Sequence, residues 1–192
     1  MIGHQVFIRK KQAFDIASRV LSQQIEKDLH IQTTCVIYAL YEVEGLDSSD
    51  LVYFQQEVLG DKVTDEMFNT LETSDCSVIA YTLLAGHFDQ RAYYAHQAGS
   101  LVLERGSDFS VRSSTVLVFN SILPECDREK IKSYVINPAD TRERSLSYEK
   151  STPPAQKHMK SLSEFTSMNP TQLMKLKDEL GLAMSLEICL YI

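Results

Sequence analysis

The sequence lacks tryptophan, and none of its apolar runs is longer than a strand. Because a transmembrane helix needs about 20 consecutive apolar residues, we expect no membrane span. The chain is also short of positive charge: 19 lysine and arginine residues face 26 aspartate and glutamate residues, a formal net charge of −7. Proteins that bind the phosphate backbone of nucleic acids usually present a basic face. The composition therefore argues against both a membrane and a general nucleic-acid partner.

Cysteine is scarce and dispersed. The four cysteines are Cys35, Cys76, Cys126 and Cys189, and none forms a Cys-x-x-Cys pair. This spacing argues against a structural zinc site, and we expect no metal site in this chain. The first residues, Met1 to Lys11, contain no apolar core of a secretory signal. We therefore expect a cytoplasmic protein with reduced thiols.

Signatures of nucleotide binding and of metalloproteases are absent as well. The sequence contains no Gly-x-x-x-x-Gly-Lys-[Ser/Thr] phosphate loop, no Gly-x-Gly-x-x-Gly turn and no His-Glu-x-x-His motif. Its 192 residues are 44% hydrophobic, which is enough for an ordinary globular core. From the residues alone we expect a globular domain without a visible active site.

What the sequence does contain is one pattern of strands and helices that occurs twice. Apolar alternation predicts strands, and a spacing of three to four predicts helices. The first copy predicts strand His4–Lys11, helix Phe14–Leu29, strand Thr33–Leu46 and helix Asp47–Gly60. The second copy predicts strand Ser77–Ala85, helix Phe88–Leu103, strand Arg112–Leu123 and helix Pro124–Asn137.

Matching residues connect the two copies. The corresponding positions are Phe14 and Phe88, Asp15 and Asp89, Leu46 and Leu123, and Gly60 and Asn137. Both aspartates are expected to cap their helices, because a carboxylate accepts hydrogen bonds from the free N–H groups of a first turn. Glycine and asparagine tolerate left-handed backbone best, so Gly60 and Asn137 are expected to end their helices in that conformation.

The duplication predicts the fold class. We expect an α+β domain over residues 1–145, built from two β-α-β-α repeats at about 4–61 and 77–140. The repeats would form a pseudo-two-fold, antiparallel-rich sheet with helices on one face. A further short strand in each repeat, with Thr64 to Leu71 as a candidate place, is left open.

The composition changes after Asp140. The stretch from Thr141 to Glu164 is polar, contains Pro153-Pro154, and is expected to lack packed regular structure. We assign 146–164 as a linker and 165–192 as a truncated helical region. Its helix would be capped by Asn169 and begin at Pro170, and a second helix that begins near Ser185 would be cut short by the end of the chain.

Two stretches offer candidate functional residues. His87, Asp89 and His96 suggest a base oriented by a carboxylate, but a capping role for Asp89, with Phe88 packed on the first helical turn, is the stronger interpretation. After Asn137, Arg142 and Arg144 suggest a phosphate or domain contact. The alternative, a helix exit followed by a solvated linker, is favoured. We therefore expect no catalytic residues here.

Five stretches, in this order, resemble the N-terminal part of the large bacterial form of phosphoribosylformylglycinamidine synthase. They are VFIRKKQAFDI, YEVEGLDSSD, GHFDQRAYYA, SYVINPADTRE and ELGLAMSLE. The resemblance extends to about Glu187. It implies a duplicated domain that is similar to a dimer of the separate small subunit of this enzyme, followed by a linker, ATP-binding synthase domains and a glutaminase domain.

The family's histidine motif, synthase domains and glutaminase cysteine do not occur in this sequence, and His87 replaces a glutamine that is common in the family. The resemblance implies a fragment of an ATP-dependent C–N ligase and glutamine amidotransferase of purine biosynthesis, inactive alone. ATP and magnesium are expected only in the full enzyme. The implied role is a scaffold that packs on the synthase and glutaminase domains. The interface residues that the resemblance implies are Asp89, Gln90, Arg91, Asn137, Pro138, Asp140 and Arg142. A stand-alone, small-subunit-like assembly protein is the alternative, and an uncovered interface would allow the isolated chain to self-associate.

Overall fold

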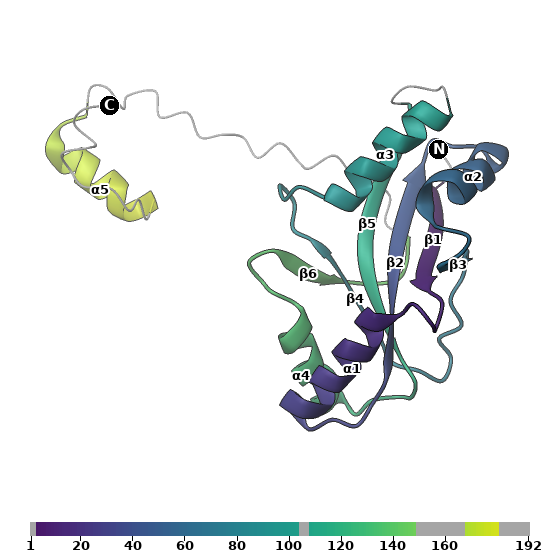
Figure 1. Cartoon of the computed structure of the whole chain (residues 1–192). Coiled ribbons are helices and arrows are strands. Elements are labelled where there is room, and N and C mark those ends of the chain that lie inside the picture. Colours follow the sequence, from purple (N-terminus) through teal and green to yellow (C-terminus); the bar gives the residue numbers. More distant parts are fainter. Residues whose placement is uncertain (1–2, 104–107, 149–167, 181–192) are drawn as a thin grey trace. The chain divides into compact units, whose positions relative to one another are not determined.

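The computed structural model describes residues 3–103, 108–148 and 168–180 (Figure 1). The chain divides into two compact units, Met1–Ser151 and Thr152–Ile192. The second unit contributes helix α5 (Pro170–Leu180), whose first turn Asn169 caps by accepting a hydrogen bond from the Gln172 N–H at 2.9 Å. The expected start of this helix is confirmed, whereas the predicted second helix near Ser185 lies outside the described residues.

The first unit has the following elements along the chain. They are β1 (Gly3–Lys10), α1 (Ile16–Leu29), β2 (Cys35–Glu44), α2 (Ser48–Phe54), the π-helical turn η1 (Gln55–Leu59), β3 (Asp65–Phe68), β4 (Val78–Leu83), α3 (Gln90–Val102), β5 (Ser110–Phe119), α4 (Glu125–Val135) and β6 (Thr141–Arg144). The predicted α+β class is confirmed. A short strand does lie within Thr64 to Leu71, as β3.

All six strands form one open antiparallel sheet in the order β3-β1-β2-β5-β4-β6. The long central pair β2–β5 runs in unbroken register from Cys35 opposite Phe119 to Glu44 opposite Ser110. β-branched and aromatic residues make up half of each strand, which suits the crowded, pleated surface at the centre of a sheet. Short strands occupy both edges, so little unpaired backbone is exposed there.

One face of the sheet carries the helices α1 to α4 (Figure 1). Tyr41 and Val43 of β2 pack with Phe54 of α2 and Ala95 of α3. Further along the same face, a second cluster contains Ile25 of α1, Ile79 of β4, Leu117 of β5 and Ile131 of α4. These two clusters bury part of the apolar pattern that predicted the helices, whereas Ile16 and Val20 of α1 stay exposed.

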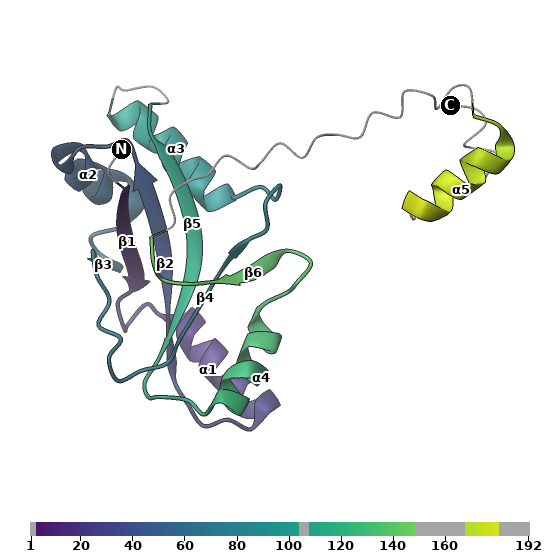
Figure 2. The ribbon, with the colours of Figure 1, turned by 180° about the vertical axis from the view of Figure 1, so that it is seen from behind.

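No helix formed by the described residues of the first unit lies over the opposite face (Figure 2). Its apolar cluster consists of Phe7, Tyr38, Leu40, Ala80 and Val116, all buried. The chain that follows β6 crosses this face. Leu146 packs on the cluster, and its carbonyl accepts a hydrogen bond from Gln5 of β1 at 2.9 Å.

Tyr148 continues this crossing segment. Its hydroxyl donates to Glu44 at 2.6 Å, and burial together with that carboxylate raises the pKa of Tyr148 to about 12. The ring lies so close to Gly3 that a side chain at Gly3 would collide with it. The segment from Ser145 to Tyr148 is therefore an integral part of the first unit.

A buried ion pair fastens β6 to the centre of the sheet. Arg144 donates from Nη1 to Glu42 Oε2 and from Nη2 to Glu42 Oε1, both at 2.8 Å, and Nη1 also donates to Ser114 Oγ at 3.0 Å. Three strand spacings separate β6 from β2, about 14 Å in a flat sheet. Because side chains stand roughly perpendicular to a sheet, this contact requires the sheet to curve, and Figure 2 shows β6 running across the direction of the central strands.

β6 corrects the sequence interpretation. The stretch from Thr141 to Glu164 was expected to lack packed structure after a simple helix exit, and this is wrong for Thr141–Arg144. The strand has no apolar alternation because its buried residue is Arg144, and the partner that makes this burial possible, Glu42, is 102 residues away. The part of the stretch from residue 149 onward lies outside the described residues.

The predicted left-handed helix ends are also wrong. Gly60 is extended, with φ −149°, because α2 continues into the wider turn η1. Asn137 does not have a positive φ; its side chain instead accepts from the Ala139 N–H at 3.1 Å and donates to Asp140 at 2.6 Å. Among the described non-glycine residues, positive φ occurs at His30, which follows α1.

We predict that Glu42→Gln lowers the free energy of unfolding by about 3 kcal/mol, because it removes the carboxylate that accepts two hydrogen bonds from the buried Arg144 guanidinium. Urea denaturation of the purified chain measures this loss. The matched control is Glu66→Gln, which breaks the half-exposed Arg9–Glu66 pair (2.7 Å) and should cost no more than about 1 kcal/mol. Equal losses in the two variants would contradict the role assigned to the buried pair.

The same pair predicts a dependence on pH. Burial disfavours the charged form of Glu42, but the hydrogen bonds and charge of Arg144, with Arg112 and Gln5, outweigh burial and hold the pKa below its ordinary value of 4.5. A depressed pKa contributes stability above the unfolded value, and this contribution is lost as pH falls through the folded value. The stability difference between the native chain and Glu42→Gln should therefore shrink below pH 4.5; a constant difference in urea titrations from pH 7 to pH 3 would refute this.

Candidate functional site

The two candidate segments, which are about 50 residues apart in sequence, meet at one end of β4 and β6. Leu83 of β4 lies opposite Thr141 of β6, and the Leu84 N–H donates to the Asp140 carbonyl at 2.8 Å. His87 Nδ1 then lies 4.0 Å from Asp140 Oδ1. We refer to residues 87–91 together with 137–142 as the corner site.

Asp89 connects the start of α3 to strand β5. It caps α3 by accepting from the Ala92 N–H at 2.9 Å, and it also accepts from the Ser113 N–H at 2.9 Å and the Ser113 hydroxyl at 2.8 Å. The predicted capping role is confirmed, as is the packing of Phe88 on the first turn: its ring lies 5.2 Å from that of Tyr93. A carboxylate with three such donors is a structural group and is not poised as a base.

The two histidines do not come together around Asp89. His87 is exposed and faces Asp140, whereas the His96 ring packs against Phe109 with centroids 4.7 Å apart. The geometry therefore offers no base oriented by a carboxylate. This agrees with the stronger of the two sequence interpretations.

Beside the corner lies a cavity of about 460 Å³, lined by both segments through Gln90, Arg91 and Thr141. Arg91 is exposed and makes one long hydrogen bond, from Nη1 to the Ser114 carbonyl at 3.4 Å. Gln90, Asn137, Pro138, Asp140 and Arg142 are exposed as well. Of the seven residues expected at a domain interface, Asp89 is half-buried and the other six are exposed.

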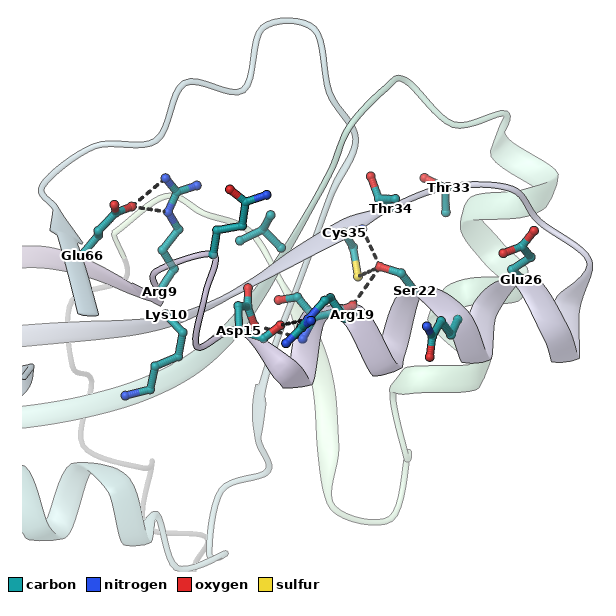
Figure 3. Close-up of a pocket in the computed structure, with 14 residues that line it drawn as sticks. Arg9, Lys10, Asp15, Arg19, Ser22, Glu26, Thr33, Thr34, Cys35 and Glu66 are labelled. Atoms are coloured by element: carbon teal, nitrogen blue, oxygen red, sulfur yellow. Dashed lines mark hydrogen bonds and ion pairs between the residues drawn. The ribbon is translucent and has the colours of Figure 1, made fainter. Parts of the chain in front are cut away.

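A larger groove of about 640 Å³ lies between α1 and the edge of β2 (Figure 3). The sequence interpretation missed it. Ser18 and Ser22 of α1 accept hydrogen bonds from the Ile37 and Cys35 N–H groups, at 2.9 and 3.0 Å. Their i, i+4 spacing on the face of α1 that also carries Leu21, Ile25 and Leu29 is the one signal that could have indicated a polar contact there.

Two of the basic residues that line this groove take part in ion pairs. Arg9 and Lys10 form ion pairs with Glu66 and Asp65. Burial raises the pKa of the Cys35 thiol, which makes it a poor nucleophile. The Cys35 thiol is therefore not an activated nucleophile in this groove.

No group of three or more His, Cys, Asp or Glu residues that could hold a metal ion occurs within residues 3–103, 108–148 and 168–180. In that part of the chain, the structure also contains no helix long and apolar enough to span a membrane. No protein-family model, curated protein or solved structure matches this chain. Function must therefore be inferred from the residues and their geometry.

We predict that Arg91→Ala leaves the melting temperature almost unchanged, because the side chain is exposed and its one hydrogen bond is long. Asp89→Ala is the matched comparison at the same corner. It removes three hydrogen bonds, among them a helix cap, and should cost about 2 kcal/mol. Differential scanning calorimetry of both variants checks the contrast, and a large loss for Arg91→Ala would make that residue structural rather than available to a partner.

Proposed function

We propose that this chain is the non-catalytic, N-terminal scaffold part of phosphoribosylformylglycinamidine synthase. In the full enzyme, formylglycinamide ribonucleotide, glutamine and ATP are converted to formylglycinamidine ribonucleotide. The chain would pack on the synthase and glutaminase domains, and would itself bind neither ATP nor magnesium. The observation that carries the proposal is the meeting of GHFDQR and INPADTR, two of the stretches with the family's character, at one exposed corner.

The arrangement of the strands supports the duplication that this proposal requires. Each half of the chain supplies three strands, and the order β3-β1-β2 of the first half is mirrored by β5-β4-β6 of the second. The third strand of each half occupies an edge, the first lies inside it, and the second lies at the centre. A pseudo-two-fold axis between β2 and β5 would relate the halves in this way.

The register supports the same axis. Ala39 of β2 lies opposite Thr115 of β5. On one side, Ala39 lies opposite Ile8 of β1, which lies opposite Met67 of β3. On the other side, Thr115 lies opposite Tyr81 of β4, which lies opposite Glu143 of β6. The spacing from the second strand to the third is the same in both halves, from Ala39 to Met67 and from Thr115 to Glu143.

The helix starts support it at the level of single hydrogen bonds. In the first half, Asp15 accepts from the Ser18 N–H, and the Ser18 hydroxyl accepts from the Ile37 N–H. In the second half, alanine replaces this serine at Ala92, and Asp89 accepts directly from the Ser113 N–H. Ile37 and Ser113 each lie two residues before the central pair Ala39–Thr115.

A stand-alone, small-subunit-like assembly protein is the alternative, because two joined halves would already make a complete pair of such subunits. Both roles use the same exposed corner, but each predicts a different arrangement of the synthase sequence in the genome. Synthase motifs downstream of Ile192, in any reading frame, favour the scaffold. A separate synthase gene nearby favours the assembly protein.

The functional test is reconstitution. The catalytic part of a large bacterial synthase, expressed without its own N-terminal region, should gain glutamine-dependent ATP hydrolysis when this chain is added. The chain alone should hydrolyse neither ATP nor glutamine, because phosphoryl transfer needs a phosphate cradle and metal-binding carboxylates and glutamine hydrolysis needs an activated nucleophile.

With Arg91→Ala, the concentration of chain that gives half of the maximal gain should rise about tenfold or more. A tenfold rise corresponds to a loss of about 1.4 kcal/mol in binding free energy. Lys130→Ala, at an exposed position on α4, is the control and should behave as the native chain does. Turnover by the chain alone, or no gain at any concentration, would refute the scaffold.

A further inference from the structure

A cavity of about 270 Å³ opens where α1 and α3 begin beside the central strand β2. Asp15 lines it from the α1 side, Arg91 from the α3 side, and Tyr41 from β2. Sites for drug-sized ligands measure about 300–1,000 Å³, so this cavity suits a smaller molecule.

Three of the five charged side chains that line the cavity are already paired within the chain. Arg9 pairs with Glu66 at 2.7 Å, and Lys10 pairs with Asp65 at 2.5 Å. Asp65 also accepts a hydrogen bond from the Thr64 hydroxyl at 3.1 Å. These three charges therefore need no ligand.

Tyr41 is buried, with 9% of its surface exposed, and its hydroxyl has no hydrogen-bond partner among the described residues. The hydroxyl of a buried tyrosine usually has a partner. Burial raises the pKa of Tyr41, the charge of Arg91 opposes this rise, and the charges of Asp89 and Asp65 add to it. The hydroxyl therefore keeps its proton at neutral pH, and it is a hydrogen-bond donor without an acceptor, near the charge of Arg91.

The two other charged side chains of the cavity are incompletely bonded. Within the described part of the chain, the Arg91 guanidinium forms no ion pair and makes one hydrogen bond, to the Ser114 carbonyl at 3.4 Å. Asp15 is 9% exposed, and in the same part of the chain its carboxylate accepts one hydrogen bond, from the Ser18 N–H at 3.0 Å. A buried carboxylate is costly unless it is paired and hydrogen-bonded. One side of the cavity therefore offers donors, and the other offers an acceptor.

We propose that the cavity binds a small zwitterion of the amino-acid type, with its carboxylate at Arg91 and Tyr41 and its ammonium group at Asp15. A guanidinium donates to both oxygens of a carboxylate in one plane, and the Tyr41 hydroxyl supplies a further donor. A ligand with a single charge would leave either Asp15 or Arg91 without a partner in the cavity, whereas a zwitterion supplies a partner to both. The proposal depends on these three side chains and does not rest on the proposed function.

Amide chemical-shift titration of the full chain with each of the standard amino acids, up to about 10 mM, tests the proposal. We expect at least one of them to bind with a dissociation constant in the millimolar range or below. The N-acetyl form and the methyl ester of that amino acid each lack one charge, and each should bind the native chain at least about tenfold more weakly. This comparison uses the native chain alone, so it does not depend on how a substitution affects folding.

Substitutions then locate the ligand. Tyr41→Phe and Arg91→Gln should each raise the dissociation constant at least about tenfold, because each removes donors to a charged group. The matched controls Tyr81→Phe and Arg19→Gln change residues that do not line this cavity, and they should leave the dissociation constant unchanged. The proposal is overturned if no amino acid binds, if either derivative binds as tightly as the amino acid, or if Tyr41→Phe and Arg91→Gln leave binding unchanged.

Discussion

The buried ion pair between Glu42 and Arg144 is the contact on which the second half of the fold depends. β6 contributes four residues and, among the described strands, pairs with β4 alone, so its ladder gives it little stability. The bidentate contact at 2.8 Å anchors it to the centre of the sheet, curves the sheet, and directs the following residues across the helix-free face. The corner site depends on this arrangement, because the pairing of β6 with β4 places Asp140 beside Leu84 and His87, in the loop before α3.

A second constraint places the helices. The central strands β2 and β5 are longer than their outer neighbours β1 and β4. Part of the edge that each central strand turns toward its outer neighbour is therefore left without a strand partner. Side chains from the helix starts satisfy the exposed N–H groups: Ser18 and Ser22 in the first half, and Asp89 in the second. Buried backbone donors without partners are costly. This requirement explains why the first turn of each helix lies against the edge of a central strand.

Much of this fold could be predicted from local sequence. Apolar periodicity located the long strands and helices, and the repeated Phe-Asp located the caps at Asp15 and Asp89. β6 could not be found, because the burial of Arg144 depends on Glu42, far along the chain, and a strand whose buried residue is charged resembles a linker. The ends at Gly60 and Asn137 were misjudged because propensity for left-handed backbone does not reveal a π turn or a side chain that bonds its own turn. The two segments of the corner site were candidates in the sequence, but their contact could not be predicted without β6. The groove beside α1 could not be predicted without knowing where the pairing of β1 with β2 ends.

The central claim is that Glu42 and Arg144 act as one unit, and a double-mutant cycle tests it most directly. Glu42→Gln, Arg144→Met and the double variant are compared with the native chain by urea denaturation at neutral pH. If the pair acts as a unit, the double variant loses much less stability than the two single losses added together, with a coupling of at least about 2 kcal/mol, because removing both partners leaves no buried charge uncompensated. Losses that add to within about 0.5 kcal/mol would show that the two residues act independently, and the account of how β6 is held would then be wrong.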